Sequence, residues 1–410
     1  DSKPIRRPMS RHTDVSHQKC GAFSQSHTKA AHFQHRLQQK LHLMVQSLYD
    51  QQLNYRTQLV QNLTTHLASE QYESQYNQHR PQMQKVKLLI MGGAGYIGSH
   101  IVRLLNESQD FEPIVYDNLV TGHKETIPSN VTFVEGDAKN EQLLCETMKK
   151  HHISGVIHLC AYSLVGESVL NPLKYFDNNV VGAISLLKAM QACEVHNLVF
   201  SSTAACYGEP TRIPIKEEDA TVPINPYGQS KLMIEQMIRT LPLNSICFRY
   251  FNVAGAGMGV GEMHSPETHL IPNIVKAALS GNPVKLFGTD YPTADGTCVR
   301  DYIHVVDLAE AHVLGMRHLL KNGQQTTKLI LNLGSKLGCS VREIIGAVQK
   351  VAPLGVKEEP RREGDPATLV ADPTKAFEVL GWKTTRGVDE MVQSAYKFHK
   401  DVEPEYQHKK

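Results

Sequence analysis

The part of the chain after residue 84 alternates short apolar runs with amphipathic stretches. The apolar runs have the length of buried strands and cover residues 85–91, 112–117, 131–135, 155–159, 197–202 and 245–250. Residues 96–106 have helical periodicity, and further helices fit between the other runs. Because strands that alternate with helices build parallel sheets covered on both faces, we predict an α/β fold with a doubly wound parallel sheet.

The alternation weakens after about residue 253, where glycine- and proline-containing loops become more frequent. We therefore expect residues 85–252 to form the sheet domain and residues 253–410 to form mainly a smaller α/β lobe beside it.

The first 84 residues differ in composition from the rest. They contain fifteen Gln, eight His and one Gly, and they carry a net charge of +5 against −3 for the remainder. We expect disorder up to residue 28, then helix over about 30–69, where leucines recur at spacings of three and four. Three interpretations stay open for this extension: a docking or oligomerisation helix, an appendage without a role in chemistry, and an organelle transit segment rich in basic residues.

Composition narrows the classes of function. Hydrophobic residues make up 41% and charged residues 20% of the chain, which is ordinary for a globular protein. The sequence contains no run of about 18 apolar residues, the length that a membrane span needs. The net negative charge after residue 84 does not favour nucleic acid as a partner. The eight cysteines form no Cys-x-x-Cys or metal-like cluster, so we expect no metal site, thiols in a reducing compartment, and a cytoplasmic location.

A glycine-rich turn follows the first predicted strand. Gly92, Gly95 and Gly98 let the backbone approach a pyrophosphate at the N-terminus of the next helix. The second strand ends at Asp117, nineteen residues after Gly98, where a carboxylate accepts hydrogen bonds from ribose hydroxyls and repels a 2′-phosphate. These features predict a Rossmann-type domain that binds NAD, and the glycine spacing resembles that of short-chain dehydrogenases/reductases.

Tyr227 and Lys231 are four residues apart on a predicted helix that begins at Pro226, so both side chains share one face. A tyrosine is a poor base near neutral pH, and we expect the lysine ammonium and the positive nicotinamide to lower its pKa. Thr203 ends a strand upstream, where hydroxyls face the ligand crevice of such sheets. The three residues together predict proton transfer on a substrate hydroxyl.

On these residues the chain resembles UDP-glucose 4-epimerases, members of the extended short-chain dehydrogenase family, over essentially all of residues 85–400. The matching stretches are residues 92–100, 116–119, 135–137, 156–158, 165–168, 177–179, 200–208, 225–231, 249–252, 288–305 and 361–365. The resemblance implies tightly held NAD, a homodimer formed through two helices per subunit, and a role in galactose metabolism.

The resemblance also implies residue roles by position. The cofactor-binding set is Gly92, Gly95, Tyr96, Ile97, Gly98, Asp117, Asn118, Asp137, Ala138, Leu159, Cys160, Ala161, Asn179, Ser201, Tyr227, Lys231 and Tyr250. The UDP-sugar-binding set is Thr203, Tyr227, Phe251, Asn252, His269, Leu270, Phe287, Arg300, Tyr302, Arg362, Asp365 and Leu369. In this scheme Tyr227 removes the proton of the sugar 4-hydroxyl while hydride moves to NAD. The 4-keto sugar then rotates about its pyrophosphate link, and hydride returns to its opposite face.

Three positions depart from the family pattern. Thr203 stands where many members have Ser, and His269 stands where some have Asn. Ser163 stands where well-known members have a lysine near the cofactor pyrophosphate, which removes one charge contact with the cofactor.

Alternatives within and outside this chemistry remain. A 4,6-dehydratase would need an Asp-Glu pair directly after Thr203, where this chain has Ala204 and Ala205. A 4-epimerase of another UDP-sugar, with an N-acetylhexosamine, pentose or uronic acid, shares every motif above. A cofactor-sensing binding protein is a different class, and it has no need for Thr203, Tyr227 and Lys231 together.

Overall fold

The computed structural model describes residues 84–321, 326–361 and 366–407, and the part from Gln84 onward forms one compact unit. The disorder and the helix expected within residues 1–83 lie outside these described residues. Within the described ranges, no helix combines the length and the apolar character that crossing a membrane requires.

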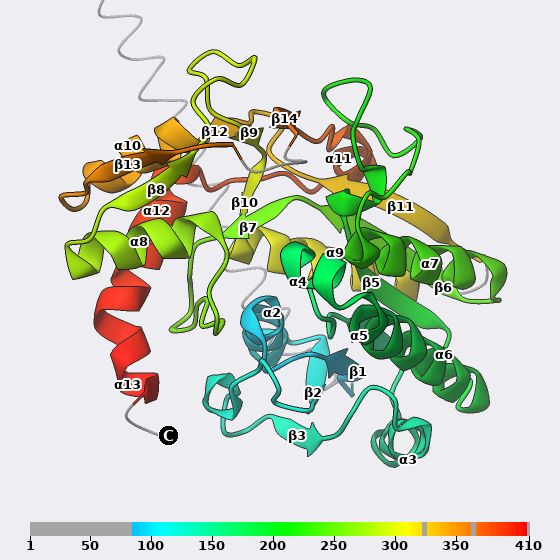
Figure 1. Cartoon of the computed structure of the whole chain (residues 1–410). Helices are drawn as coiled ribbons and strands as arrows, with labels where there is room; N and C mark the ends of the chain where they lie inside the picture. Colours follow the sequence, from blue (N-terminus) through cyan, green and yellow to red (C-terminus); the bar gives the residue numbers. More distant parts are fainter. Residues whose placement is uncertain (1–83, 322–325, 362–365, 408–410) are drawn as a thin grey trace, which may run out of the picture. The chain divides into compact units, whose positions relative to one another are not determined.

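A seven-stranded parallel sheet forms the centre of the unit (Figure 1). Its strands are β1 (Val86–Met91), β2 (Phe111–Asp117), β3 (Thr132–Glu135), β4 (Gly155–His158), β5 (Asn197–Thr203), β6 (Asn244–Tyr250) and β11 (Lys328–Leu333). They lie in the order β11-β6-β5-β4-β1-β2-β3. The order reverses at β1, between β4 and β2, so the carboxyl ends of these strands border the crevice where such sheets bind ligands.

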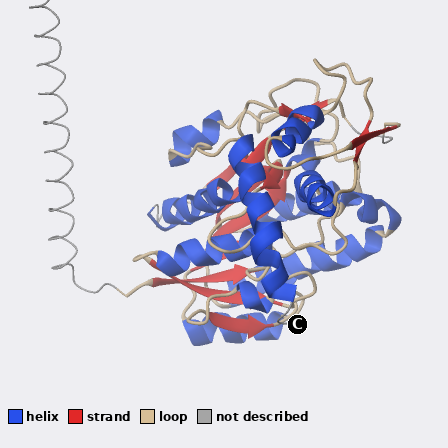
Figure 2. Cartoon of the chain, turned by 90° about the vertical axis from the view of Figure 1, so that its left-hand side faces the viewer, coloured by secondary structure: helices blue, strands red, loops and turns tan. Residues whose placement is uncertain are grey.

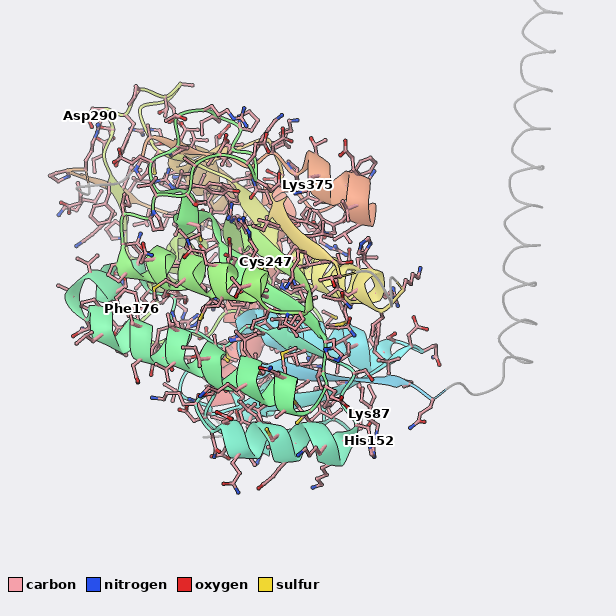
Figure 3. All side chains as sticks on the ribbon, turned by 90° about the vertical axis from the view of Figure 1, so that its right-hand side faces the viewer. Lys87, His152, Phe176, Cys247, Asp290 and Lys375 are labelled. Atoms are coloured by element: carbon pink, nitrogen blue, oxygen red, sulfur yellow. The ribbon has the colours of Figure 1, made fainter. Side chains whose placement is uncertain are left out.

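Helices cover both faces of this sheet, as predicted (Figure 2). One layer contains α2 (Tyr96–Glu107), α9 (Val305–Lys321) and α11 (Thr374–Leu380). The other contains α3 (Glu141–His151), the π-helical turn η2 (Phe176–Val181), α6 (Gly182–Ala192) and α7 (Pro226–Thr240). Figure 3 looks onto this second layer, with Phe176 at the start of η2. The prediction of a doubly wound α/β fold is confirmed.

The alternation of side chains along β1 explains the two cores. Leu88 and Ile90 pack with α2 and α9, whereas Leu89 and Met91 pack with α3, α6 and α7. All four are fully buried, because successive strand residues point to opposite faces and both faces are covered. A central parallel strand therefore appears in the sequence as a continuous apolar run.

A second group of elements lies beside the carboxyl ends of the strands. Its helices are α8 (Leu270–Ser280), α10 (Val341–Gln349) and α12 (Val388–Lys397), followed by η4 (Phe398–Val402) and α13 (Glu403–Gln407). Its strands are β7 (Asn252–Ala254), β8 (Val284–Phe287), β9 (Val299–Arg300), β10 (Tyr302–His304), β12 (Cys339–Ser340), β13 (Val356–Glu359) and β14 (Thr368–Leu369). Short elements complete the fold: η1 (Lys124–Thr126), α4 (Val165–Leu170), α5 (Pro172–Tyr175) and η3 (Ala204–Tyr207).

The chain returns to the main sheet after it has entered this second group. Strand β11 pairs with β6, and α9 packs against α2. The predicted boundary between residues 252 and 253 is therefore a boundary in the sequence. In space, β11 and α9, which follow it, belong to the main sheet and its helices. The division into a cofactor domain and a sugar lobe stays a prediction.

Candidate active site

A cavity of about 630 Å³ opens at the carboxyl ends of β1, β2, β4, β5 and β6. Most of the residues predicted for the site line it. From the cofactor set these are Gly92, Gly95, Tyr96, Ile97, Gly98, Asp117, Asn118, Ala138, Leu159, Cys160, Ala161, Ser201, Tyr227, Lys231 and Tyr250. From the sugar set they are Thr203, Phe251, Asn252, His269, Leu270, Arg300, Tyr302 and Leu369.

The glycine turn has the shape that a pyrophosphate needs. Gly92 adopts φ +79°, and a Cβ there would lie 2.7 Å from the backbone nitrogen of Cys160. A Cβ on Gly98 would lie 2.1 Å from the carbonyl oxygen of Gly92, so this position excludes every larger residue. Gly95 caps α2 without a side chain, which leaves backbone N–H groups of the first turn directed at the cavity. The turn therefore fits a dinucleotide.

Asp117 lies at the end of β2 with 8% of its surface exposed. Its carboxylate accepts hydrogen bonds from the backbone N–H groups of Ala94 (3.0 Å) and Leu119 (2.8 Å). Burial raises the pKa of Asp117, and these N–H groups oppose that effect. A carboxylate has about four lone-pair sites, so the oxygens fixed in this way keep capacity for ribose hydroxyls.

The helix α7 presents Tyr227 and Lys231 to the cavity. Asn225 caps this helix by accepting a hydrogen bond from the Gly228 N–H (2.8 Å), and Pro226 occupies its first turn. Lys231 is 2% exposed and donates from Nζ to the carbonyl oxygen of Ser201 (2.7 Å). Burial lowers the pKa of Lys231 to about 8, so its charge is held in a site that is poor in water.

The structure differs from the sequence expectation about the acidity of Tyr227. Burial raises the pKa of this phenol above its ordinary value, while a hydrogen bond with Thr203 lowers it. Partial burial in the cavity wall disfavours the phenolate by more than the surrounding protein groups favour it. A phenolate at Tyr227 would therefore require positive charge close to the ring.

Some predicted residues lie next to the cavity without lining it. Asn179 holds the segment after β4 by accepting from the Tyr162 N–H (2.9 Å) and donating to the Ser230 hydroxyl (3.1 Å). Asp137 accepts from the N–H of Lys139 (2.8 Å). Phe287 ends β8 outside the lining set. Arg362 and Asp365 lie outside the described residues, and the roles of all five stay predictions.

Two further lining residues were not found from sequence. Nδ1 of His264 bonds to the carboxylate of Glu262, and Nδ1 of His269 bonds to Glu267 (2.8 Å). Burial lowers the pKa of His269, but its hydrogen bond to Glu267 and the two nearby carboxylates raise it above the ordinary value. The ligand atoms of Glu262, His264 and His269 lie within 4.8 Å of one another, and Nδ1 of each histidine is already bonded to a glutamate.

Other lining residues outside the predicted sets come from strands, helices and loops near the motifs. They are Tyr116, Val120, Thr121, Gly136, Tyr162, Ser163, Val165, Val169, Asn178, Ala204, Ala205, Gly208, Ile224, Asn225, Val253, Ala254, Ile271 and Pro366. Several flank a motif residue directly, so extending each motif by one position would have included them.

Comparison with known proteins agrees with this geometry. The model of the NAD dependent epimerase/dehydratase family matches residues 88–334. The chain belongs to this family. It is 48% identical to the UDP-glucose 4-epimerase of Halalkalibacterium halodurans over 324 residues, which cover 77% of this chain and 96% of that protein.

Solved structures give the same result. The UDP-glucose 4-epimerase of Brucella ovis in complex with NAD has a TM-score of 0.73 and 44% identity, covering 76% of this chain and 97% of that one. The enzyme of Bifidobacterium longum in complex with NAD⁺ and UDP has a TM-score of 0.71 and 36% identity, covering 77% and 99%.

Proposed function

We propose that this chain is a UDP-glucose 4-epimerase that interconverts UDP-glucose and UDP-galactose, with NAD as its cofactor, in galactose metabolism. The observation that carries the proposal is the meeting of Thr203, Tyr227 and Lys231 in the same cavity as the glycine turn and Asp117. A proton-transfer group beside a dinucleotide site is what oxidation and reduction of one sugar carbon require.

The chain's own residues divide the chemistry among them. The chemistry that NAD supplies when bound is reversible hydride transfer at C4 of the sugar. Tyr227 takes the proton of the 4-hydroxyl and later returns it, and Thr203 positions that hydroxyl through the hydrogen bond that it shares with Tyr227. Lys231 holds positive charge near the phenolate, which stabilises the state that forms during proton removal.

The other end of the cavity suits the nucleotide. Arg300 lines it and offers a guanidinium fork to a diphosphate. His269, Leu270 and Ile271 line it at the start of α8, where N–H groups point at the cavity and the helix dipole favours anions. Firm binding of UDP with loose binding of the sugar lets a 4-keto sugar present either face to the cofactor.

The wall near the sugar favours small substituents. Leu369 pairs in β14 with Arg300 of β9 and lines the cavity. An acetamido group at C2 is several heavy atoms larger than a hydroxyl, and overpacking a close-packed wall costs about 1–3 kcal/mol. We therefore place UDP-galactose ahead of its N-acetylated counterpart as substrate. The 4-epimerase of another UDP-sugar remains the second reading.

We also infer that the enzyme is a cytoplasmic homodimer. No disulfide joins the cysteines of the described residues, which supports a reducing compartment. Apolar side chains are exposed along the short helices that follow β4: Val169 (59%), Leu170 (80%) and Leu173 (79%). A second copy of the chain covering this surface would remove it from water.

The test is product analysis. Purified protein is incubated with UDP-galactose or UDP-N-acetylgalactosamine, without added NAD, and the sugar nucleotides are separated. We expect UDP-glucose from the first substrate and a lower kcat/KM for the second. A 4-keto-6-deoxy product would point to dehydration, and no product from either substrate would refute the proposal.

A further inference from the structure

A buried ion pair, Glu235 with Arg249, joins α7 to the sheet strand β6. Glu235 follows Lys231 by one turn of α7, and its carboxylate accepts hydrogen bonds from Nε (3.0 Å) and Nη2 (2.6 Å) of Arg249. The side chains are 3% and 4% exposed, respectively. The hydroxyl of Ser202 donates to the same carboxylate. Neither charged residue lines the cavity, and the mechanism above does not use them.

The network extends from the pair into three strands. The Arg249 guanidinium on β6 lies over the ring of Tyr207, 4.8 Å from its centre. The Tyr207 hydroxyl in turn donates to Oδ1 of Asn332 on β11 (2.6 Å). Glu235 therefore joins α7 to β5 through Ser202, to β6 through Arg249, and through Tyr207 to β11.

The end of β5 and the face of α7 are connected residue by residue. Tyr227, Lys231 and Glu235 recur at a spacing of four, so they share one face of the helix. Lys231 bonds the carbonyl of Ser201, Glu235 bonds Ser202, and Tyr227 bonds Thr203. The first and third contacts are made by catalytic groups that face the cavity. The second is made by Glu235, which does not line the cavity.

We propose that the Glu235–Arg249 pair positions the reaction, fixing α7 against β5 so that the Tyr227 phenol stays beside Thr203. The inference rests on the proposed epimerase function, and it makes Glu235 a positioning residue because it touches no reacting atom. Small displacements matter in such a site, since a misplacement of about 1 Å can cost about 10²-fold in rate.

Stability alone does not explain the pair. Replacing a buried ion pair by apolar residues of similar volume is often neutral or stabilising, because the desolvation of two charges offsets their attraction. Losing one partner is different, since an unpaired charge is left in the core. The double replacement Glu235→Met with Arg249→Met therefore separates folding from positioning.

The experiment compares full-length wild type with this double variant and with Ser202→Ala. The single variant removes the contact between Ser202 on β5 and Glu235, together with a weaker contact to the Cys206 thiol (3.7 Å). Turnover of UDP-galactose, affinity for UDP, NAD content and the urea midpoint are measured for each. We expect the double variant to fold, to keep UDP affinity and NAD within about twofold, and to lose at least about tenfold in kcat. Ser202→Ala should lose at least about threefold.

A second ion pair, in which the carboxylate is buried and the arginine is 26% exposed, serves as the control. Asp307 is fully buried and binds Arg386, and neither residue lines the cavity. Asp307→Asn with Arg386→Met should lower the urea midpoint and leave kcat within about twofold. An equal loss of kcat in this control would overturn the proposal, as would a folded double variant or Ser202→Ala with wild-type kcat. If the double variant does not fold, Ser202→Ala decides. Absence of turnover in wild type would instead refute the epimerase function.

Discussion

At the scale of single residues, the proposed proton transfer depends most on Tyr227. Its phenol lines the cavity, bonds Thr203 and is half-buried. We expect Tyr227→Phe to lose about 10²-fold or more in kcat, the usual worth of general acid–base catalysis, with UDP affinity unchanged. Turnover and UDP binding by calorimetry measure the two effects.

The control for Tyr227→Phe is Tyr406→Phe. Tyr406 donates its hydroxyl to the Gly259 carbonyl (2.9 Å) outside the cavity. This variant also loses one phenol hydrogen bond, and its kcat should match wild type. More than about a tenth of wild-type kcat in Tyr227→Phe would contradict the assigned role.

The charge of Lys231 makes a prediction about pH. Its pKa is lowered by burial to about 8, so the ammonium is lost as the pH rises through that value. Because the phenolate of Tyr227 needs this charge, kcat/KM for UDP-galactose should fall above about pH 8. Lys231→Arg, whose guanidinium stays charged, should be slower but should lack this alkaline limb. A flat profile to about pH 9.5 in wild type would argue against the role of Lys231.

The residues that the sequence could predict are those whose role is set by local geometry. Glycines at a strand-to-helix turn and a Tyr-Lys pair one helical turn apart need only their spacing. The Tyr227 pKa could not be predicted, because it depends on burial by elements distant in sequence. Glu262 and His264 were missed for a related reason: nothing in their spacing shows that the loop before α8 reaches the cavity.

At the scale of elements, the start of α2 leaves no room for a side chain at Gly98. A Cβ on Gly98 would meet the Gly92 carbonyl at 2.1 Å, so Gly98→Ala must distort the turn. We expect this variant to lose most of its NAD and some stability. Nucleotide released by acid and the urea midpoint are the two measurements.

Gly346 offers a comparison within a helix. It lies in α10, and a Cβ there would meet no heavy atom within 4 Å. Gly346→Ala should therefore raise the free energy of unfolding by about 0.5–1 kcal/mol, because glycine is unfavourable inside helices, and it should keep its NAD. If both alanine variants kept NAD equally, the glycine turn would not be the cofactor site.

The strands from β1 to β6 were predicted well. Each predicted apolar run is a strand in the structure, and its ends differ from the prediction by about one residue at most. The return of β11 and α9 to the sheet was not predicted. Pairing between β6 and β11 joins segments about 80 residues apart, and the intervening short strands carry too weak a pattern to show where the chain leaves the sheet and comes back.

At the scale of the whole molecule, residues 84–410 form a compact unit that contains every residue of the cavity. A shortened chain that starts at Gln84 should therefore keep the kcat and NAD content of the full chain. Circular dichroism establishes that it folds. A folded but inactive shortened chain would show that the N-terminal extension completes the site or the assembly.

In the proposed reaction, hydride leaves C4 of the sugar and returns to the same carbon. The most direct measurement uses UDP-galactose carrying deuterium at C4, with mass spectrometry and NMR of the product. If hydride returns to the same carbon, the product is UDP-glucose that keeps its deuterium at C4, and no deuterium is released to water. Loss of deuterium to solvent, its appearance at another carbon, or absence of UDP-glucose would contradict it.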